Sequence, residues 1–189
     1  FLAGYFLYID GVDTVVRMAV DYGMSIGFGS TDLIAALLLV QFVGFPATLV
    51  FGRIARPLGP RGGIFLALAV YAAATVWAST MTATWEFYAL ATVIGLVQGG
   101  VQALSRSLFA RLVPPQRAGE FFGFYNMMGK FAAVIGPVLV GWVGHAAGEP
   151  RVGILSLLLL FAGGAVLLAR VEVPPTGVRA QGSSAGAPK

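Results

Sequence analysis

Four ionisable side chains lie at helical spacing in the first apolar segment of the chain. They stand at positions i, i+3, i+7 and i+11 and are Asp10, Asp13, Arg17 and Asp21. At 100° per residue, Asp10, Arg17 and Asp21 fall within about 40° of one another, with Asp13 about 60° to one side. Each charge would cost on the order of 2.5–3.5 kcal/mol at the centre of a bilayer, so this face must meet protein or water.

This charged face has two interpretations, and the sequence leaves both open. In the first, Asp10 or Asp13 carries a proton or another cation along a pathway, and Arg17 holds a carboxylate anion. In the second, the charges form a structural ion-pair network, because Asp13 and Asp21 each stand four residues from Arg17. Asp10 is the first functional candidate, since no basic residue stands four positions further along.

A second polar stripe occurs in a later apolar segment. Gln98, Gln102 and Arg106 follow one another at i+4 steps. Amides offer donors and acceptors to a polar solute, but they also make ordinary hydrogen bonds between helices. Arg106 stands near the end of its segment, where it can extend to the membrane interface or pair with an acid. We expect the stripe to line a solute pathway or to join helices.

A third polar pair follows in the next segment. Asn126 and Lys130 stand at i and i+4. Lys130 lies about ten residues into its segment, which is roughly 15 Å deep at 1.5 Å per residue. That depth is too great for an easy reach to the interface, so we expect Lys130 to face the bundle beside Asp10 or Asp13. Such a buried pair can gate transport or can be structural.

Membrane-spanning helices are needed to position these residues, and the composition predicts them. Only 11% of the residues are charged and 58% are hydrophobic, whereas soluble domains carry roughly 25% charged residues. A span needs about 20 mostly apolar residues, and six segments qualify. They are 1–26, 31–52, 62–80, 85–108, 120–145 and 152–170. We therefore predict an all-α, six-helix transmembrane bundle over residues 1–171, followed by a disordered cytoplasmic tail over 172–189.

The distribution of basic residues predicts the orientation of the bundle. Arginines gather in the loops after the second and fourth spans and near the C-terminus, and the opposite loops hold only Arg151. By the positive-inside rule, the basic loops and both termini are cytoplasmic. The chain begins at Phe1 inside an apolar stretch, so we expect an upstream part.

The order of polar and apolar spans also carries information. The third and sixth spans contain no charge across their central residues, whereas the other four carry polar side chains at depth. This order suits a three-plus-three repeat in which the third helix of each unit faces lipid and the others line a cavity.

Several classes of function are not indicated by the sequence. The chain has no cysteine and one histidine, so we expect no metal centre and no cofactor. It has no phosphate-binding loop and no hydrolase motif, so we expect no enzymatic activity. Its net charge of +4 fits basic cytoplasmic loops, and we expect no nucleic-acid partner.

Four stretches resemble known membrane transporters. Residues 52–61, Gly-Arg-Ile-Ala-Arg-Pro-Leu-Gly-Pro-Arg, resemble the loop motif of the major facilitator superfamily, although Arg56 replaces the usual acid. Residues 5–14, 98–107 and 120–125 resemble the vacuole effluxer family of that superfamily. The resemblance implies that these spans are helices seven to twelve of a twelve-helix fold, with an N-terminal six-helix half missing. It also implies export of small solutes such as amino acids.

The resemblance and the polar spans together predict a secondary transporter that works by alternating access in the lipid bilayer, with proton coupling as one option. The short loops favour a bacterial inner membrane. Two alternatives stay open: a non-transporting scaffold or receptor, and a half-sized transporter that acts as a homodimer.

Overall fold

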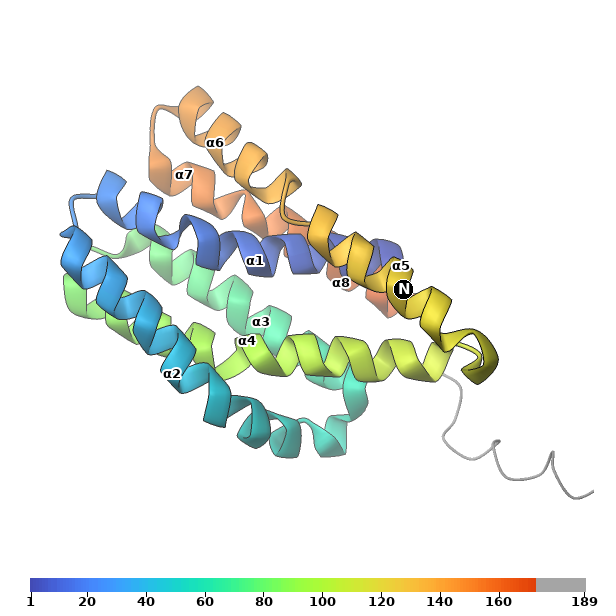
Figure 1. The fold of residues 1–189 in the computed structure, drawn as a ribbon. Coiled ribbons are helices and arrows are strands. Elements are labelled where there is room, and N and C mark those ends of the chain that lie inside the picture. Colours follow the sequence, from blue (N-terminus) through green and yellow to red (C-terminus); the bar gives the residue numbers. More distant parts are fainter. Residues whose placement is uncertain (173–189) are drawn as a thin grey trace, which may run out of the picture.

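The structure, a computed structural model, describes residues 1–172, and these form an all-helical bundle (Figure 1). The elements are α1 (Leu2–Ser25), α2 (Ser30–Ile54), η1 (Arg56–Leu58), α3 (Gly59–Thr80), α4 (Thr84–Leu112), η2 (Pro115–Arg117), α5 (Ala118–Phe131), α6 (Ile135–Ala147), α7 (Pro150–Leu155) and α8 (Leu157–Ala169). The predicted all-α fold is confirmed. The predicted disordered tail lies outside the described residues except for Glu172.

Five stretches of the described chain are long and apolar enough to cross a membrane. They are α2, η1 with α3, α4, η2 with α5 and α6, and α7 with α8. The remaining helix, α1, has 24 residues and is therefore about 36 Å long, enough to span a hydrocarbon core. It differs from the other five in carrying the four ionisable side chains of the charged face.

Two of the predicted spans are interrupted rather than continuous. The fifth breaks at residues 132–134, between α5 and α6. Pro137 explains this break, because its ring crowds the carbonyl group four residues earlier and it has no N–H to donate. The sixth breaks at Ser156, whose hydroxyl donates to the Gly153 carbonyl at 2.6 Å and so competes with helical hydrogen bonding.

Glycines bring two pairs of helices into close contact. Along α4, a Cβ at Gly99 or Gly100 would collide with Thr48 or Phe51 of α2. Between α1 and α8, a Cβ at Gly164 would lie 2.7 Å from the Cβ of Tyr8. Small residues of this kind let membrane helices approach until their backbones touch. These contacts fix how far α1 and α4 stand from their neighbours.

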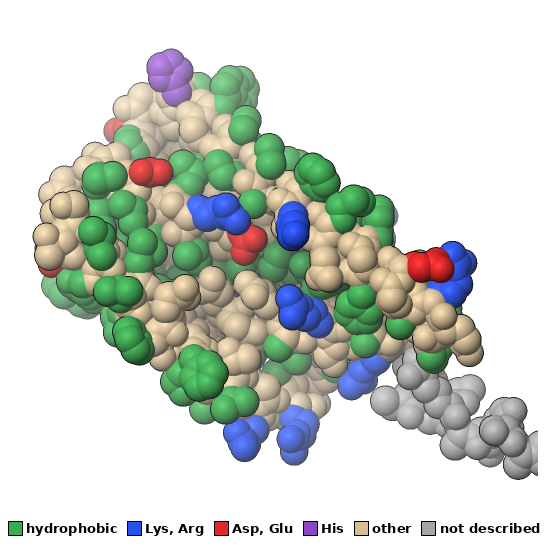
Figure 2. All heavy atoms as spheres, viewed as in Figure 1, with side chains coloured by type: hydrophobic (Ala, Val, Ile, Leu, Met, Phe, Trp, Pro, Cys, Tyr) green, Lys and Arg blue, Asp and Glu red, His purple; other side chains and the backbone are tan. Residues whose placement is uncertain are grey.

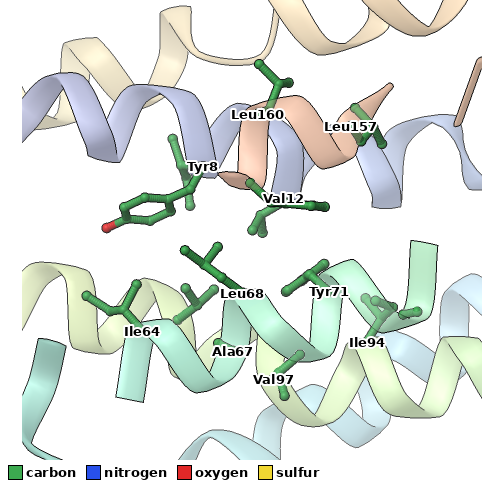
Figure 3. Packing of buried hydrophobic residues seen from close by; sticks show 14 of the residues in the cluster. Tyr8, Val12, Ile64, Ala67, Leu68, Tyr71, Ile94, Val97, Leu157 and Leu160 are labelled. Carbon is green, nitrogen blue, oxygen red and sulfur yellow. The ribbon is translucent and has the colours of Figure 1, made fainter. Parts of the chain in front are cut away.

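The buried core lies between these helices (Figure 3). Tyr8 and Val12 of α1 point toward Leu68 and Tyr71 of α3, and Leu157 and Leu160 of α8 lie beside α1. Tyr8, Val12, Tyr71 and Leu157 are fully buried. The apolar side chains of α1 are therefore used inside the bundle, whereas Asp13 is half-buried and Arg17 is exposed.

Two arginines tie α3 to the α7–α8 pair at opposite ends. Arg61, at the start of α3, donates to the carbonyl of Ala169, the last residue of α8, and to that of Val171 beyond the helix at 3.0 Å. Arg151, at the start of α7, donates to the carbonyls of Met81 at 2.9 Å and Ser79 at the end of α3. Each arginine follows a proline at a helix start. The helix α3 and the α7–α8 pair, which are the third spans of the two groups of three, therefore run antiparallel, and an arginine at the start of each contacts the end of the other. An inverted three-plus-three repeat would place them in this way.

Large apolar side chains are most exposed on α2 and on α5–α6. Phe42 and Phe45 of α2 are 78% and 83% exposed, and Trp142 of α6 is 72% exposed. By contrast, α3 and α8 pack against α1 and α4 over a larger part of their surface. The largest exposed apolar side chains of this bundle therefore lie on α2 and α5–α6, whereas α3 packs against α4 and α8 packs against α1.

Candidate solute pathway

An open pocket of about 360 Å³ lies between α1, α4 and α5. Its lining consists of Tyr5, Ile9 and Asp13 from α1, Gln102 and Arg106 from α4, and Tyr125, Asn126, Gly129 and Lys130 from α5. The volume falls within the roughly 300–1,000 Å³ of small-molecule sites. Figure 2 shows acidic and basic side chains together over α1 and α5, on a face that carries many apolar side chains. The pocket brings five of the eight predicted pathway residues together.

A buried hydrogen bond connects α1 to α4. The Ser105 hydroxyl donates to the Val101 carbonyl at 2.7 Å, so the Tyr8 hydroxyl acts as donor to the Ser105 Oγ, also at 2.7 Å. Both side chains are fully buried. This contact joins the two helices five residues before Asp13 and one residue before Arg106, both of which line the pocket.

The charges of the pocket do not pair with one another directly. Within residues 1–172 the structure contains one ion pair, between Arg117 and Glu120 on the surface. The expected pairing of Lys130 with an aspartate is therefore not formed, although Lys130 and Asp13 line the same pocket. The two candidate pairs of Arg17 with its neighbours on α1 are likewise absent from the described part of the chain. Asp13, Arg106 and Lys130 thus present separate charges to the pocket.

Asp10 occupies a different environment from Asp13. It is fully buried, it does not line the pocket, and its Oδ2 accepts a hydrogen bond from the Gly136 N–H at 2.7 Å. Gly136 stands in the first turn of α6, where backbone N–H groups lack partners within the helix. The carboxylate therefore caps the helix that begins after the α5–α6 break.

Two further predicted residues lie apart from the pocket. Arg17 is exposed on α1, and Gln98 is half-buried on α4; neither lines the pocket. Gln98 stands one turn before Gln102, and the slow rotation of an i+4 stripe carries it away from the pocket.

Two tyrosines line the pocket that were not among the predicted pathway residues. Tyr5 of α1 stacks on Tyr125 of α5 with ring centroids 4.2 Å apart, and Tyr125 stacks on Phe109 of α4 at 4.9 Å. The stack continues to Phe1, whose ring packs on Phe109. The sequence offered one indication for Tyr5, because helical spacing places it about 80° from Asp13 around the same helix.

Comparison with known proteins identifies relatives of the chain. A family model described as "Vacuole effluxer Atg22 like" matches residues 1–181. The chain is 41% identical over 171 residues to the uncharacterized MFS-type transporter YxiO of Bacillus subtilis (strain 168). This match covers 90% of the chain and 40% of YxiO. It is 29% identical over 191 residues to autophagy-related protein 22 of Cryptococcus neoformans var. neoformans (strain B-3501A), covering 92% of this chain and 35% of that protein. The chain thus spans less than half the length of these relatives.

Proposed function

The chain belongs to the vacuole effluxer Atg22-like family, and we propose that it forms the C-terminal six-helix half of a secondary active transporter of the major facilitator type. In this proposal the chain is an integral protein of a bacterial inner membrane, and both ends of its six-helix bundle lie in the cytoplasm. The name of the relative YxiO, an MFS-type transporter, supports the transport activity. The match covers only 40% of that relative, which supports a further part of the protein beyond this chain.

The observation that carries the proposal is the polar pocket between α1, α4 and α5. Charged side chains in a membrane segment are costly unless they serve a water-filled pathway or pair with one another. Asp13, Arg106 and Lys130 line one pocket and form no ion pair within the described residues. Their charges are therefore available to a solute.

The pocket chemistry favours small zwitterions such as amino acids. The guanidinium of Arg106 and the ammonium of Lys130 can donate to a carboxylate. The carboxylate of Asp13 can accept from an ammonium group, and the amides of Gln102 and Asn126 supply further donors and acceptors. An amino acid presents both charged groups at once, so it matches this mixed set better than a simple anion or cation does.

We further propose that Asp13 carries the proton if transport is proton-coupled. It is half-buried and borders the pocket, where water and solute can reach it. Asp10 is fully buried and engaged with Gly136. Alternating access would then arise from rocking of this half against the other half around the pocket.

The exposed apolar faces of α2 and α5–α6 support the presence of a second half. Side chains such as Phe42, Phe45 and Trp142 lie on the outside of this bundle. We propose that part of this surface packs against the N-terminal six helices and that the remainder meets lipid. The polar pocket between α1, α4 and α5 would then face the opposite half and become enclosed.

A counterflow experiment with the full-length protein in proteoliposomes tests the proposal. Labelled neutral amino acids are offered to vesicles preloaded with unlabelled solute, with and without an imposed pH gradient. The test variant is Arg106→Gln and the matched control is Arg111→Gln, on the same helix but outside the pocket lining. We expect the first to lower kcat/KM at least about tenfold, the loss of a charge-assisted contact of about 1.4 kcal/mol. The control should stay within about twofold of wild type.

Two outcomes would contradict the proposal. Equal transport by both arginine variants would show that the pocket does not bind solute. No movement of any of the neutral amino acids by the wild-type protein would favour a scaffold or receptor. Asp13→Asn provides the coupling test, because it should remove acceleration by the pH gradient while counterflow continues.

A further inference from the structure

Two buried oxygen atoms of α1 lie beside the α5–α6 break without hydrogen-bond partners. They are Asp10 Oδ1 and Thr14 Oγ1, and both residues are fully buried. Asp10 and Thr14 stand one helical turn apart on the same face of α1. They do not hydrogen-bond to each other, and Asp10 forms no ion pair within residues 1–172. Buried polar atoms nearly always have partners, so this pair requires an explanation.

The hydroxyl of Thr14 differs from four other hydroxyls within these helices. Thr48, Thr75, Thr92 and Ser105 each donate to the carbonyl four residues earlier, at 2.7–2.9 Å. Thr14 makes no such bond. Its side chain instead points at α6, since a Cβ at Gly136 would collide with Thr14 Oγ1 and lie 2.8 Å from Thr14 Cβ. The Thr14 oxygen is therefore directed at the break between α5 and α6.

The end of α5, on the other side of the break, supplies free backbone oxygens. Residues 132–134 lie outside both helices, and the Ala132 N–H bonds to the Met128 carbonyl at 2.9 Å. The carbonyls that follow Met128 at the end of α5 have no α-helical N–H to accept from, because the helix stops. A helix C-terminus carries partial negative charge and favours a cation nearby.

We propose that Asp10, Thr14 and the backbone carbonyls at the end of α5 form a binding site for a sodium ion. Carboxylate, hydroxyl and carbonyl oxygens are hard ligands suited to a small, hard cation. Interrupted membrane helices supply such carbonyls to sodium in other transporter folds. The remaining Asp10 oxygen, Oδ2, stays on the Gly136 N–H, so the ion would link α1 to both sides of the break.

Sodium accounts for both oxygens where simpler occupants account for one. A proton on Asp10 would neutralise the carboxyl group but leave the Thr14 oxygen without a partner. A water molecule would satisfy Thr14 but bring no positive charge to the buried carboxylate, whose one hydrogen bond comes from the Gly136 N–H. The one basic residue in the last turn of α5 is Lys130, and its side chain is exposed and lines the pocket instead. The ion site is independent of the proposed transport activity and is tested by binding alone.

Sodium binding can be measured on the full-length protein purified in detergent. The melting temperature is followed against NaCl, with KCl and choline chloride at equal ionic strength as controls, and saturable binding of radioactive sodium is measured in parallel. We expect a saturable rise in melting temperature in NaCl alone. Thr14→Val should raise the apparent Kd for sodium at least about tenfold, the range seen when groups around a bound metal are removed. Thr14→Ser, which retains the hydroxyl, should bind sodium like the wild type.

Thr75→Val is the matched control. Thr75 is also almost fully buried, but its hydroxyl is already bonded to the Tyr71 carbonyl, so its loss should leave the sodium Kd unchanged whatever it does to stability. Asp10→Asn should abolish saturable binding. The proposal is overturned if sodium and choline give the same melting curves, or if Thr14→Val binds sodium as tightly as Thr75→Val.

Discussion

Substituting Gly164 by alanine is expected to separate α1 from α8. The new Cβ would lie 2.7 Å from the Cβ of Tyr8 and 2.9 Å from its backbone nitrogen. Carbon atoms pack best at about 3.5–4.0 Å, so the two helices must move apart by roughly 1 Å. Backbone atoms of α1 cannot turn aside as a flexible side chain would. The contact can therefore be relieved only by a shift of a whole helix.

The free-energy cost follows from what that shift disturbs. Overpacking of a tight core costs about 1–3 kcal/mol, and alanine in place of glycine returns up to about 1 kcal/mol of helix propensity. The moving helix also carries Tyr8, whose hydroxyl bonds Ser105 of α4 at 2.7 Å, and a hydrogen bond contributes about 1 kcal/mol. We expect Gly164→Ala to lower the free energy of unfolding by about 1–3 kcal/mol.

Unfolding of the full-length protein in mixed detergent micelles measures this loss, with far-ultraviolet circular dichroism as the readout. The control is Gly141→Ala in α6, where a Cβ would meet nothing within 4 Å, so the protein should be unchanged or slightly more stable. If both variants unfold at the same detergent composition as the wild type, the close approach of α1 and α8 is wrong. Solute binding offers a second readout, because displacement of α1 also displaces Asp13.

Three further changes test other contacts. Arg151→Gln removes the two bonds to the end of α3 and should cost about 1.5–3 kcal/mol in the same unfolding assay. Tyr8→Phe should cost about 1 kcal/mol, and Tyr8→Phe combined with Ser105→Ala should cost little more than the single change, because the two share one bond. Arg117→Gln removes an ion pair whose side chains are 64% and 66% exposed, so the loss should stay below about 1 kcal/mol and shrink with added salt.

Each of these expectations has a contrary result. Wild-type stability of Arg151→Gln would mean that the caps do not hold α3 to α7. Additive losses from the two changes at Tyr8 and Ser105 would mean that the residues do not interact. A salt-independent loss of more than 2 kcal/mol in Arg117→Gln would place that ion pair in an environment other than open solvent.

The membrane helices were predictable from the sequence because hydropathy and helix-breaking residues act locally. A run of about 20 apolar residues specifies a span wherever it occurs, and the predicted boundaries lie close to those of α1 to α4. The breaks within the last two spans were only partly predictable. Pro137 indicates a disturbance of the helix, but whether the helix kinks or stops depends on whether other groups can hydrogen-bond to the backbone N–H and C=O groups that lose their helical partners. Here the Asp10 carboxylate, more than a hundred residues away in sequence, accepts a hydrogen bond from the Gly136 N–H.

The assignment of individual polar residues needed the tertiary structure. Helical periodicity placed Asp10 and Asp13 on neighbouring parts of one face, about 60° apart, and gave Asp10 priority because it lacked a basic neighbour. Because of that angle, the packing of α1 against α6 and α8 places the two carboxylates in different environments. Asp10 contacts Gly136, and Asp13 lines the pocket. The same packing leaves Lys130 near Asp13 without an ion pair.

The sequence by itself determined that this chain spans a membrane, which segments are helical, and that polar side chains occur at depth on α1, α4 and α5. These properties depend on composition and on spacing along one helix. The tertiary structure decided which of those side chains meet, because that depends on the rotation and separation of whole helices. Contacts at residues such as Gly136 and Gly164 set those distances, and glycine in a sequence does not reveal which helix will approach it.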